Sequence, residues 1–314
     1  MASTAKRPWY MFYPLAGMIL LSLAWCGYWF IAFSGAKELI QAKRLEFAGK
    51  GMELACAHES WGGFPFRFEF QCETAKLQLT HDNENYSVQS TKILAVAQAY
   101  NPLHVILLVD GPTSIDRTTI IHERALISVK VGLDKDWDAS LEATSVNADG
   151  LFTSAQLNVF ARKIDGRLDL AANAKELTVI QPENPPIIVS SAELVGQTSA
   201  SLLTQQRLAG QSLEISSLKI SQGPVDFAAT GTFSLDAQHR LAGKLSSQTN
   251  DIDGVMKFIE PIFALNEQDS ATIKNLVTLT GSDPATKMTR VDFSAKDGAL
   301  YWGLIKLADL TPLY

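Results

Sequence analysis

The chain has 314 residues, 46% apolar and 19% charged, and its 33 acidic and 27 basic side chains give a formal net charge of −6. It is too apolar for a disordered chain and long enough to bury an ordinary core in one large or two small domains. The acidic balance argues against a nucleic-acid partner, and three cysteines are too few for a zinc ribbon.

The first predicted element is a helix that crosses a membrane. No charged residue occurs from Pro8 to Ala36, and the most apolar part runs from Pro14 to Phe33. A helix rises about 1.5 Å per residue, so roughly 20 residues cross the ~30 Å hydrocarbon layer of a bilayer. Lys6 and Arg7 precede the stretch, which predicts a cytoplasmic amino terminus. We expect residues 1–36 to form a cytoplasmic stub and transmembrane anchor, and residues 37–314 to form an exported β-rich domain.

Aromatic residues near both ends of this span are typical of the two headgroup levels of a membrane, with Tyr13 at one end and Tyr28 and Trp29 near the other. A cleavable signal peptide is the alternative, because Ser34–Ala36 offers small residues at a suitable spacing. The apolar stretch exceeds the usual ~7–15 residue core of a signal peptide, so we favour a retained anchor.

A helical stalk and a disulfide are predicted next. Ser34–Lys50 is rich in helix-favouring residues and is expected to continue the span outward. Cys56 and Cys72 follow, and two nearby thiols in an exported segment tend to pair. Two separate buried cysteines are the alternative. A catalytic thiol is disfavoured, because His58 lies close to Cys56 but no third orienting group is evident.

Beyond the stalk the hydrophobic period changes to two. Phe64, Phe66, Phe68 and Phe70 alternate with other residues, which predicts a strand with one aromatic face. Short apolar runs separated by turn signals follow at intervals of about 10–15 residues, which favours an antiparallel meander. These runs are Ile106–Val109, Leu126–Val131, Leu157–Phe160, Leu168–Leu170 and Leu177–Ile180. The stiff segment at residues 181–186 is predicted to divide the exported region into two halves of one sheet.

The last third predicts three strands within residues 213–245, then two helices, then strands again. Apolar residues recur at helical spacing from Ile252 to Phe263, and Pro261 is expected to kink or split that helix. A second short helix is predicted over Asp269–Thr280. The expected fold is therefore mainly β with a few helices. A transmembrane helix precedes a curved, mostly antiparallel sheet, shaped as a half-open barrel or taco, with helices covering one end.

No motif indicates catalysis, so we expect no catalytic, metal-ligating or cofactor-binding residue and no cofactor; an envelope hydrolase stays the least favoured hypothesis. The five histidines are scattered without metal-ligand spacing. Asp134, Asp136 and Asp138 alternate as in a calcium loop, but Ala139 replaces the glycine and Ser145 the glutamate that such a loop requires. A solvated acidic turn is the favoured interpretation.

Two apolar clusters are candidates for a hydrophobic groove and its lid. The first consists of Trp61, Phe70 and the phenylalanines between them, and its alternative is an ordinary sheet core. The second is the apolar helix that carries Phe258, Ile259, Ile262 and Phe263, and its alternative is a helix packed permanently across the sheet.

The segment Cys56–Cys72 resembles the signature of an uncharacterised proteobacterial membrane-anchored family, the domain of unknown function numbered 2125. The matching hexapeptide consists of Gly63, Phe64, Pro65, Phe66, Arg67 and Phe68. Residues 100–104 and the closing Asp297–Tyr314 are also similar to that family. The C-terminal part has a distant AsmA-like resemblance, carried by paired strands such as Gly231–Gly243. This wider resemblance implies lipid handling between bacterial membranes, and the family supplies no catalytic residues.

These observations favour a single-pass protein of the bacterial inner membrane with most of its chain in the periplasm. The favoured hypothesis is that it binds lipid or another hydrophobic ligand in an apolar groove of the sheet. The alternative is a structural or assembly factor that pairs with other envelope proteins through a sheet edge.

Overall fold

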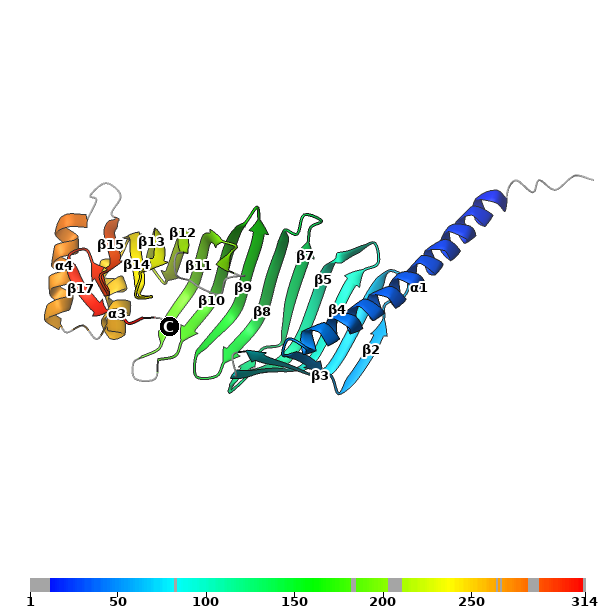
Figure 1. The fold of residues 1–314 in the computed structure, drawn as a ribbon. Helices are drawn as coiled ribbons and strands as arrows, with labels where there is room; N and C mark the ends of the chain where they lie inside the picture. The colour runs from blue at the N-terminus through cyan, green and yellow to red at the C-terminus, as the bar shows by residue number, and fades with distance from the viewer. Residues whose placement is uncertain are drawn as a thin grey trace, which may run out of the picture.

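The computed structural model describes residues 12–81, 84–181, 185–202, 211–263, 265, 267–281 and 288–312. A long helix is followed by one antiparallel sheet of seventeen strands, and two helices lie at the far end of that sheet (Figure 1). The predicted mainly β fold with an N-terminal helix is therefore confirmed.

Helix α1 (Tyr13–Ala48) combines the predicted span and the predicted stalk in one continuous helix of 36 residues. Its C-terminal end is closed at Gly49, whose backbone N–H donates to the carbonyl of Leu45 at 3.1 Å. Among the described residues, α1 is the one helix that is long and apolar enough to cross a membrane. Figure 1 shows the N-terminal part of α1 projecting beyond the sheet, while its C-terminal part lies beside the first strands.

The first strands of the sheet are β1 (Met52–Ala55), β2 (His58–Gly62), β3 (Arg67–His81), β4 (Glu84–Gln98), β5 (Asn101–Ile115), β6 (Thr118–Ile121), β7 (Arg124–Val131) and β8 (Trp137–Ala148). They continue with β9 (Phe152–Ile164), β10 (Arg167–Val179), β11 (Ile187–Ser199), β12 (Ser212–Gln222), β13 (Val225–Leu235) and β14 (Leu241–Thr249). The last are β15 (Thr289–Lys296), β16 (Ala299–Trp302) and β17 (Ile305–Asp309). From β3 onward most strands pair with the next strand in the chain, so the predicted antiparallel meander is confirmed. Among the exceptions, β1 and β2 both pair with β3, and β5 pairs with β7 as well as with β6.

Several strands are longer than their apolar runs predict. The runs Leu168–Leu170 and Leu177–Ile180 belong to one segment, and both contribute to β10. A polar stretch separates the two runs in the sequence, but its backbone keeps the hydrogen-bonded ladder to β9 and β11. Across residues 181–186, β10 still pairs with β11, so the sheet continues beyond this segment.

The prediction of a strand through all four alternating phenylalanines is wrong for its first half. Strand β3 begins only at Arg67, and Phe64 and Phe66 lie in the turn that joins β2 to β3. Gly63 adopts φ +103°, a conformation that side chains other than hydrogen rarely permit, and the N–H of Arg67 donates to its carbonyl at 3.0 Å. Pro65 has no N–H for a strand ladder, so the alternation continues through a turn.

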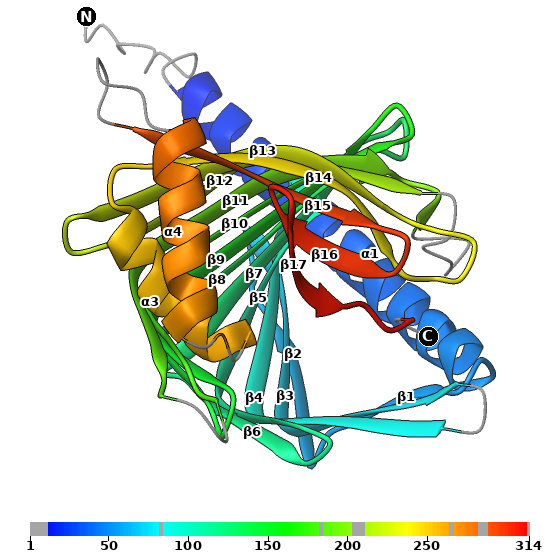
Figure 2. The ribbon, with the colours of Figure 1, turned by 90° about the vertical axis from the view of Figure 1, so that its left-hand side faces the viewer.

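The sheet is bent into a trough. Figure 2, viewed from the end that carries α3 and α4, shows β13 and β14 in one wall and β1 and β6 in the other, with α1 along the open side. Three long strands break their pairing at a residue with positive φ: Thr74 in β3, Ser145 in β8 and Glu176 in β10. Separate register shifts, which mark a β-bulge or irregularity, lie in the β4–β5, β11–β12 and β12–β13 pairings. Bulges bend a strand and increase its twist, which contributes to the curvature.

Helices α3 (Ile252–Phe263) and α4 (Glu267–Gly281) lie between β14 and β15 in the chain and pack at the far end of the trough. Helix α3 ends two residues after Pro261, and α4 corresponds to the second predicted helix. Their apolar sides form a core with the last strands. Its buried members are Val255, Met256, Ile259, Ile273, Val277, Val291 and Trp302.

Candidate functional site

One face of the sheet carries apolar side chains along most of its length. Side chains alternate along a strand and paired residues share a face, so the strand registers define rows of neighbours across the sheet. The middle row consists of Trp61, Phe70, Ala95, Leu107, Ile127, Leu141, Val159, Ala172, Leu194, Leu218 and Ala229. Ten steps of about 4.8 Å between strands make this row about 48 Å long.

Two apolar rows flank the middle one. The first consists of Phe68, Ala97, Val105, Val129, Ala139, Ala161, Leu170, Gly196, Ile215, Gly231, Leu245 and Phe293. The second consists of Cys72, Ile93, Val109, Ala125, Ala143, Leu157, Ala174, Ala192, Ile220 and Phe227. We call the three rows together the groove face. None of these side chains is charged, and the next member of the second row, in β2 at the α1 end, is Glu59, the partner of Cys72. The opposite face of the same strands carries the row Lys130, Asp138, Arg162 and Asp169.

The helices pack on the groove face at its two ends. At one end, the ring of Phe33 in α1 lies 6.4 Å from that of Trp61 and 6.3 Å from that of Phe68. At the other end, Phe258 and Ile259 of α3 line a mainly apolar cavity of about 340 Å³ together with Phe227 and other groove-face residues. The groove face is therefore the inner side of the trough, closed at one end by α3 and bordered at the other by α1.

Between these ends the apolar side chains are only half-buried. Leu107, Ile127, Leu141 and Val159 are all of intermediate exposure, and Leu194 is 39% exposed. An apolar surface of this length is costly in water and typically marks a binding surface for an apolar partner.

The predicted groove and lid residues are at opposite ends of the molecule. Trp61 and Phe70 belong to the middle row beside α1, with ring centroids 4.7 Å apart. Phe258 and Ile259 project from α3 into the cavity at the far end. The backbone of Ile262 and Phe263 lies in α3, but their side chains are outside the described part of the structure.

Helix α1 donates three hydrogen bonds to backbone carbonyls at two turns of the sheet. The indole N–H of Trp25 donates to Pro65 at 2.9 Å, and that of Trp29 donates to Arg67 at 3.0 Å. The hydroxyl of Tyr28 donates to the carbonyl of Ala99, in the β4–β5 turn, at 2.9 Å. Tyr28 and Trp29 were expected at a headgroup level of the membrane, and these contacts with the sheet were not predicted. Tyr28 and Trp29 follow Trp25 by three and four residues, and residues at these spacings lie on one face of a helix. This spacing was the one sequence signal that the three side chains could contact the same surface.

Aromatic packing surrounds these hydrogen bonds. Trp29 is only 3% exposed, and its ring stacks on Phe33 with centroids 4.6 Å apart. The ring of Phe64 meets it edge-on at 5.2 Å, and that of Phe68 lies at 5.9 Å. The hexapeptide at residues 63–68 thus forms the turn and strand start that hold α1 against the sheet.

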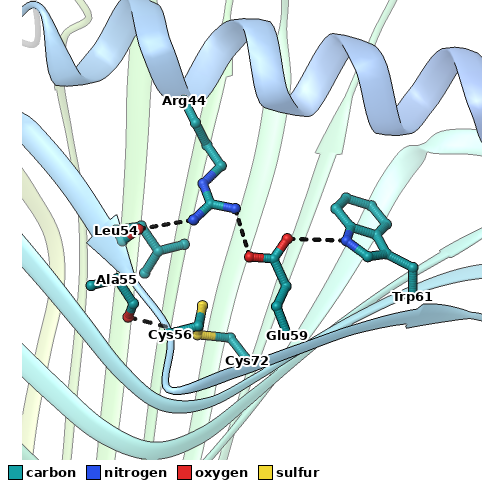
Figure 3. Close-up of polar contacts among 7 residues, drawn as sticks. All are labelled: Arg44, Leu54, Ala55, Cys56, Glu59, Trp61 and Cys72. Atoms are coloured by element: carbon teal, nitrogen blue, oxygen red, sulfur yellow. Dashed lines mark hydrogen bonds and ion pairs between the residues drawn. A yellow bond between two sulfur atoms is a disulfide. The ribbon is translucent and has the colours of Figure 1, made fainter.

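The stalk part of α1 is tied to the sheet by a polar cluster (Figure 3). Arg44 donates to a carboxylate oxygen of Glu59 at 2.8 Å and to the carbonyl of Leu54 at 2.9 Å, and the indole N–H of Trp61 donates to the other oxygen of Glu59 at 3.0 Å. Partial burial raises the pKa of Glu59, but the hydrogen bonds from Arg44 and Trp61 outweigh it, and the net pKa lies below the ordinary 4.5.

The predicted disulfide between Cys56 and Cys72 is confirmed. It joins the break between β1 and β2 to the middle of β3, and Cys72 is fully buried (Figure 3). The linkage ties the start of β2, which carries Glu59 and Trp61, to β3, so it supports both the polar cluster and the adjacent end of the groove face.

The three alternating aspartates do not share a centre. An oxygen of Asp134 accepts the backbone N–H of Asp136 at 3.2 Å within the β7–β8 turn. Asp138 instead pairs with Arg162 of β9 at 2.6 Å. The carboxylates of Asp134 and Asp138 therefore have separate local structural partners.

A family model described as "Uncharacterized protein conserved in bacteria (DUF2125)" matches residues 29–311. This span includes the hexapeptide, every strand and both C-terminal helices. No curated protein and no solved structure matches the chain. The AsmA-like resemblance is not confirmed by these comparisons and stays a prediction.

Proposed function

The chain belongs to the bacterial DUF2125 family, and we propose that it is a membrane-anchored envelope protein that holds the acyl chain of a lipid on its groove face. The supporting observation is the continuous apolar row from Trp61 to Ala229, whose central side chains are half-buried. Helix α1 is the anchor in this proposal, and the sheet lies in the periplasm.

The energetic argument depends on burial of the exposed apolar surface. Removing apolar area from water contributes roughly 25 cal/mol per Å², or about 0.8 kcal/mol for each methylene group. Burial of an acyl chain along the groove face therefore contributes several kcal/mol of binding free energy, even after the entropy cost of ordering the chain is subtracted. A polar ligand gains little such energy from the three rows, because they carry no charge and their one indole N–H, that of Trp61, already donates to Glu59.

The geometry favours a retained helix over a cleaved signal peptide. Helix α1 runs without interruption through Ser34–Ala36, the candidate cleavage site. Cleavage there would remove Trp25, Tyr28 and Trp29, and with them the three hydrogen bonds to the turns. The disulfide agrees with a periplasmic location, since disulfides persist in oxidising compartments.

The alternative, an assembly factor that adds a strand to a partner, has less support. The strands at the two edges of the sheet are short: four residues in β1, and five each in β2 and β17. Short edge strands offer few backbone groups to a partner and are one way in which proteins limit strand addition.

The test is photo-crosslinking in membranes of bacteria that produce the full chain. A photoreactive amino acid replaces Leu141 or Val159 on the groove face, and Glu142 or Asn158 serves as the matched control. Each control is adjacent to a test residue in the same strand and points to the opposite face.

We expect lipid adducts, identified by mass spectrometry, at Leu141 and Val159 but not at the two control positions. Equal labelling of both faces, or no lipid at any position, contradicts the proposal. A further probe on the edge strand β17, at Lys306, tests the alternative, because a stoichiometric protein adduct there with no lipid at 141 or 159 would favour the assembly factor.

A further inference from the structure

We infer that the β2–β3 turn (residues 63–66) and the β4–β5 turn (residues 99–100) are embedded in the membrane leaflet beside α1, so that the groove face begins within the lipid. This inference rests on the proposed membrane anchoring of α1. It assigns a lipid-contact surface to the two turns.

The depth of the turns follows from the helix residues they contact. The uncharged stretch Pro8–Ala36 is centred on residue 22, so Trp25 and Trp29 lie three and seven residues from the centre. At about 1.5 Å per residue these offsets are about 4.5 and 10.5 Å. The hydrocarbon layer extends about 15 Å on each side of the midplane, so both tryptophans lie within it.

The conclusion holds for a second register of the helix. If the aromatic residues from Trp9 to Trp29 mark the two headgroup levels, the centre moves to residue 19. Trp25 is then about 9 Å from the midplane, still within the hydrocarbon, and Trp29 is at its boundary, about 15 Å away. The ring of Phe66 lies 6.3 Å from that of Trp25, so it is placed inside the leaflet in both registers.

The outward side chains of the two turns suit a lipid environment. Phe64 is 52% exposed and Phe66 64% exposed, although each contacts α1 on one side. In the neighbouring turn and strand start, Tyr100 is 67% exposed and Leu103 46% exposed. Four large exposed side chains at two adjacent turns form an apolar patch next to the predicted span.

Hydrogen bonding provides the strongest argument. Irregular backbone is tolerated at membrane depth only where protein groups satisfy it, since lipid tails cannot. The donors Trp25, Tyr28 and Trp29 serve carbonyls at these two turns. In water these carbonyls would not need protein donors. Within the hydrocarbon layer, each of these hydrogen bonds satisfies two groups: the backbone carbonyl of the sheet and the N–H or O–H of the α1 side chain.

The charged residue nearest the turn is compatible with this placement. Arg67 carries an ion pair with Glu69 at 2.6 Å, and its side chain is 61% exposed. A long arginine side chain can extend its guanidinium toward the headgroups while its stem stays in apolar surroundings. Glu69 lies two residues further along β3, away from the turn and therefore closer to the headgroups.

The experiment measures depth in full-length protein reconstituted into vesicles of phosphatidylethanolamine and phosphatidylglycerol with brominated acyl chains. Single cysteines at Phe66 or Tyr100, in a Cys26→Ser background, carry an environment-sensitive fluorophore. Labelling without reductant keeps the Cys56–Cys72 disulfide closed, and non-reducing gels confirm it. Leu151 and Leu304 are matched controls, because they are 53% and 89% exposed and lie in turns away from α1.

We expect the probes at 66 and 100 to show blue-shifted emission and at least half the bromine quenching of a probe on native Cys26. The probes at 151 and 304 should show neither. If 66 and 100 behave like these controls while Cys26 is quenched, α1 spans the membrane but the inference about the turns is wrong. If Cys26 is not quenched either, the proposed anchoring itself fails.

Discussion

Replacement of Trp29 tests the contact between α1 and the sheet most directly. Trp29→Phe keeps most of the ring packing against Phe33, Phe64 and Phe68 but removes the indole N–H that donates to Arg67. A buried carbonyl left without a donor costs about 1–3 kcal/mol. Trp29→Ala also removes the packing, and such core truncations cost about 3–5 kcal/mol.

Hydrogen exchange of full-length protein in nanodiscs provides the measurement. The expected loss of docking energy predicts that amides of β2 and the start of β3 exchange about 5- to 150-fold faster in Trp29→Phe, because each 1.4 kcal/mol is a factor of ten. Trp29→Ala should accelerate them by a further tenfold or more. Amides of β9 and β10, which do not contact α1, should be unaffected.

Trp302→Phe serves as the matched control, since Trp302 is 2% exposed and lies in the core at the opposite end of the sheet. It should leave β2 and β3 unchanged. Unchanged exchange of β2 and β3 in Trp29→Ala would refute the argument that this residue holds the turn. Uniform acceleration across all strands would instead show that Trp29 contributes to global stability.

Three further predictions concern the disulfide and pH. Replacing Cys56 and Cys72 by serine should lower the free energy of unfolding by about 3 kcal/mol in urea titrations, as expected for a closed loop of this size. The Arg44–Glu59 coupling, about 1 kcal/mol in a double-mutant cycle at neutral pH, should be lost as pH falls through the depressed pKa of Glu59. Burial lowers the pKa of His122 below 6.5, so stability should fall with pH below about 6.5, and thermal unfolding of His122→Gln should lack this slope.

The meander and the helices were predictable because their signals are local. The alternation at Phe68 and Phe70, the turn residues Asp165 and Gly166, and the helical period after Ile252 each act over a few residues. The same local rule failed at Phe64 and Phe66, where alternation continues into a turn. Period alone does not reveal that Gly63 reverses the chain direction.

The groove face was not predictable in its extent. Its continuity depends on strand register across many pairings, and that register shifts within the β4–β5, β11–β12 and β12–β13 pairs. The contact of Trp29 with Arg67 joins residues 38 positions apart and depends on the path of α1 relative to the sheet. The spacing of Trp25, Tyr28 and Trp29 shows that they share a helix face but does not show what that face contacts.

The helices α3 and α4 limit the path that a bound lipid could take along the trough. The core that they form with the last strands blocks the far end of the groove face, so the trough is open at the α1 end and closed at the other. A lipid that enters the trough beside α1 would have to leave at that same end or laterally across the open side of the sheet. Under the proposed function, such a protein would retain its lipid, and transfer would require a recipient that reaches the open rim or displaces α3 and α4.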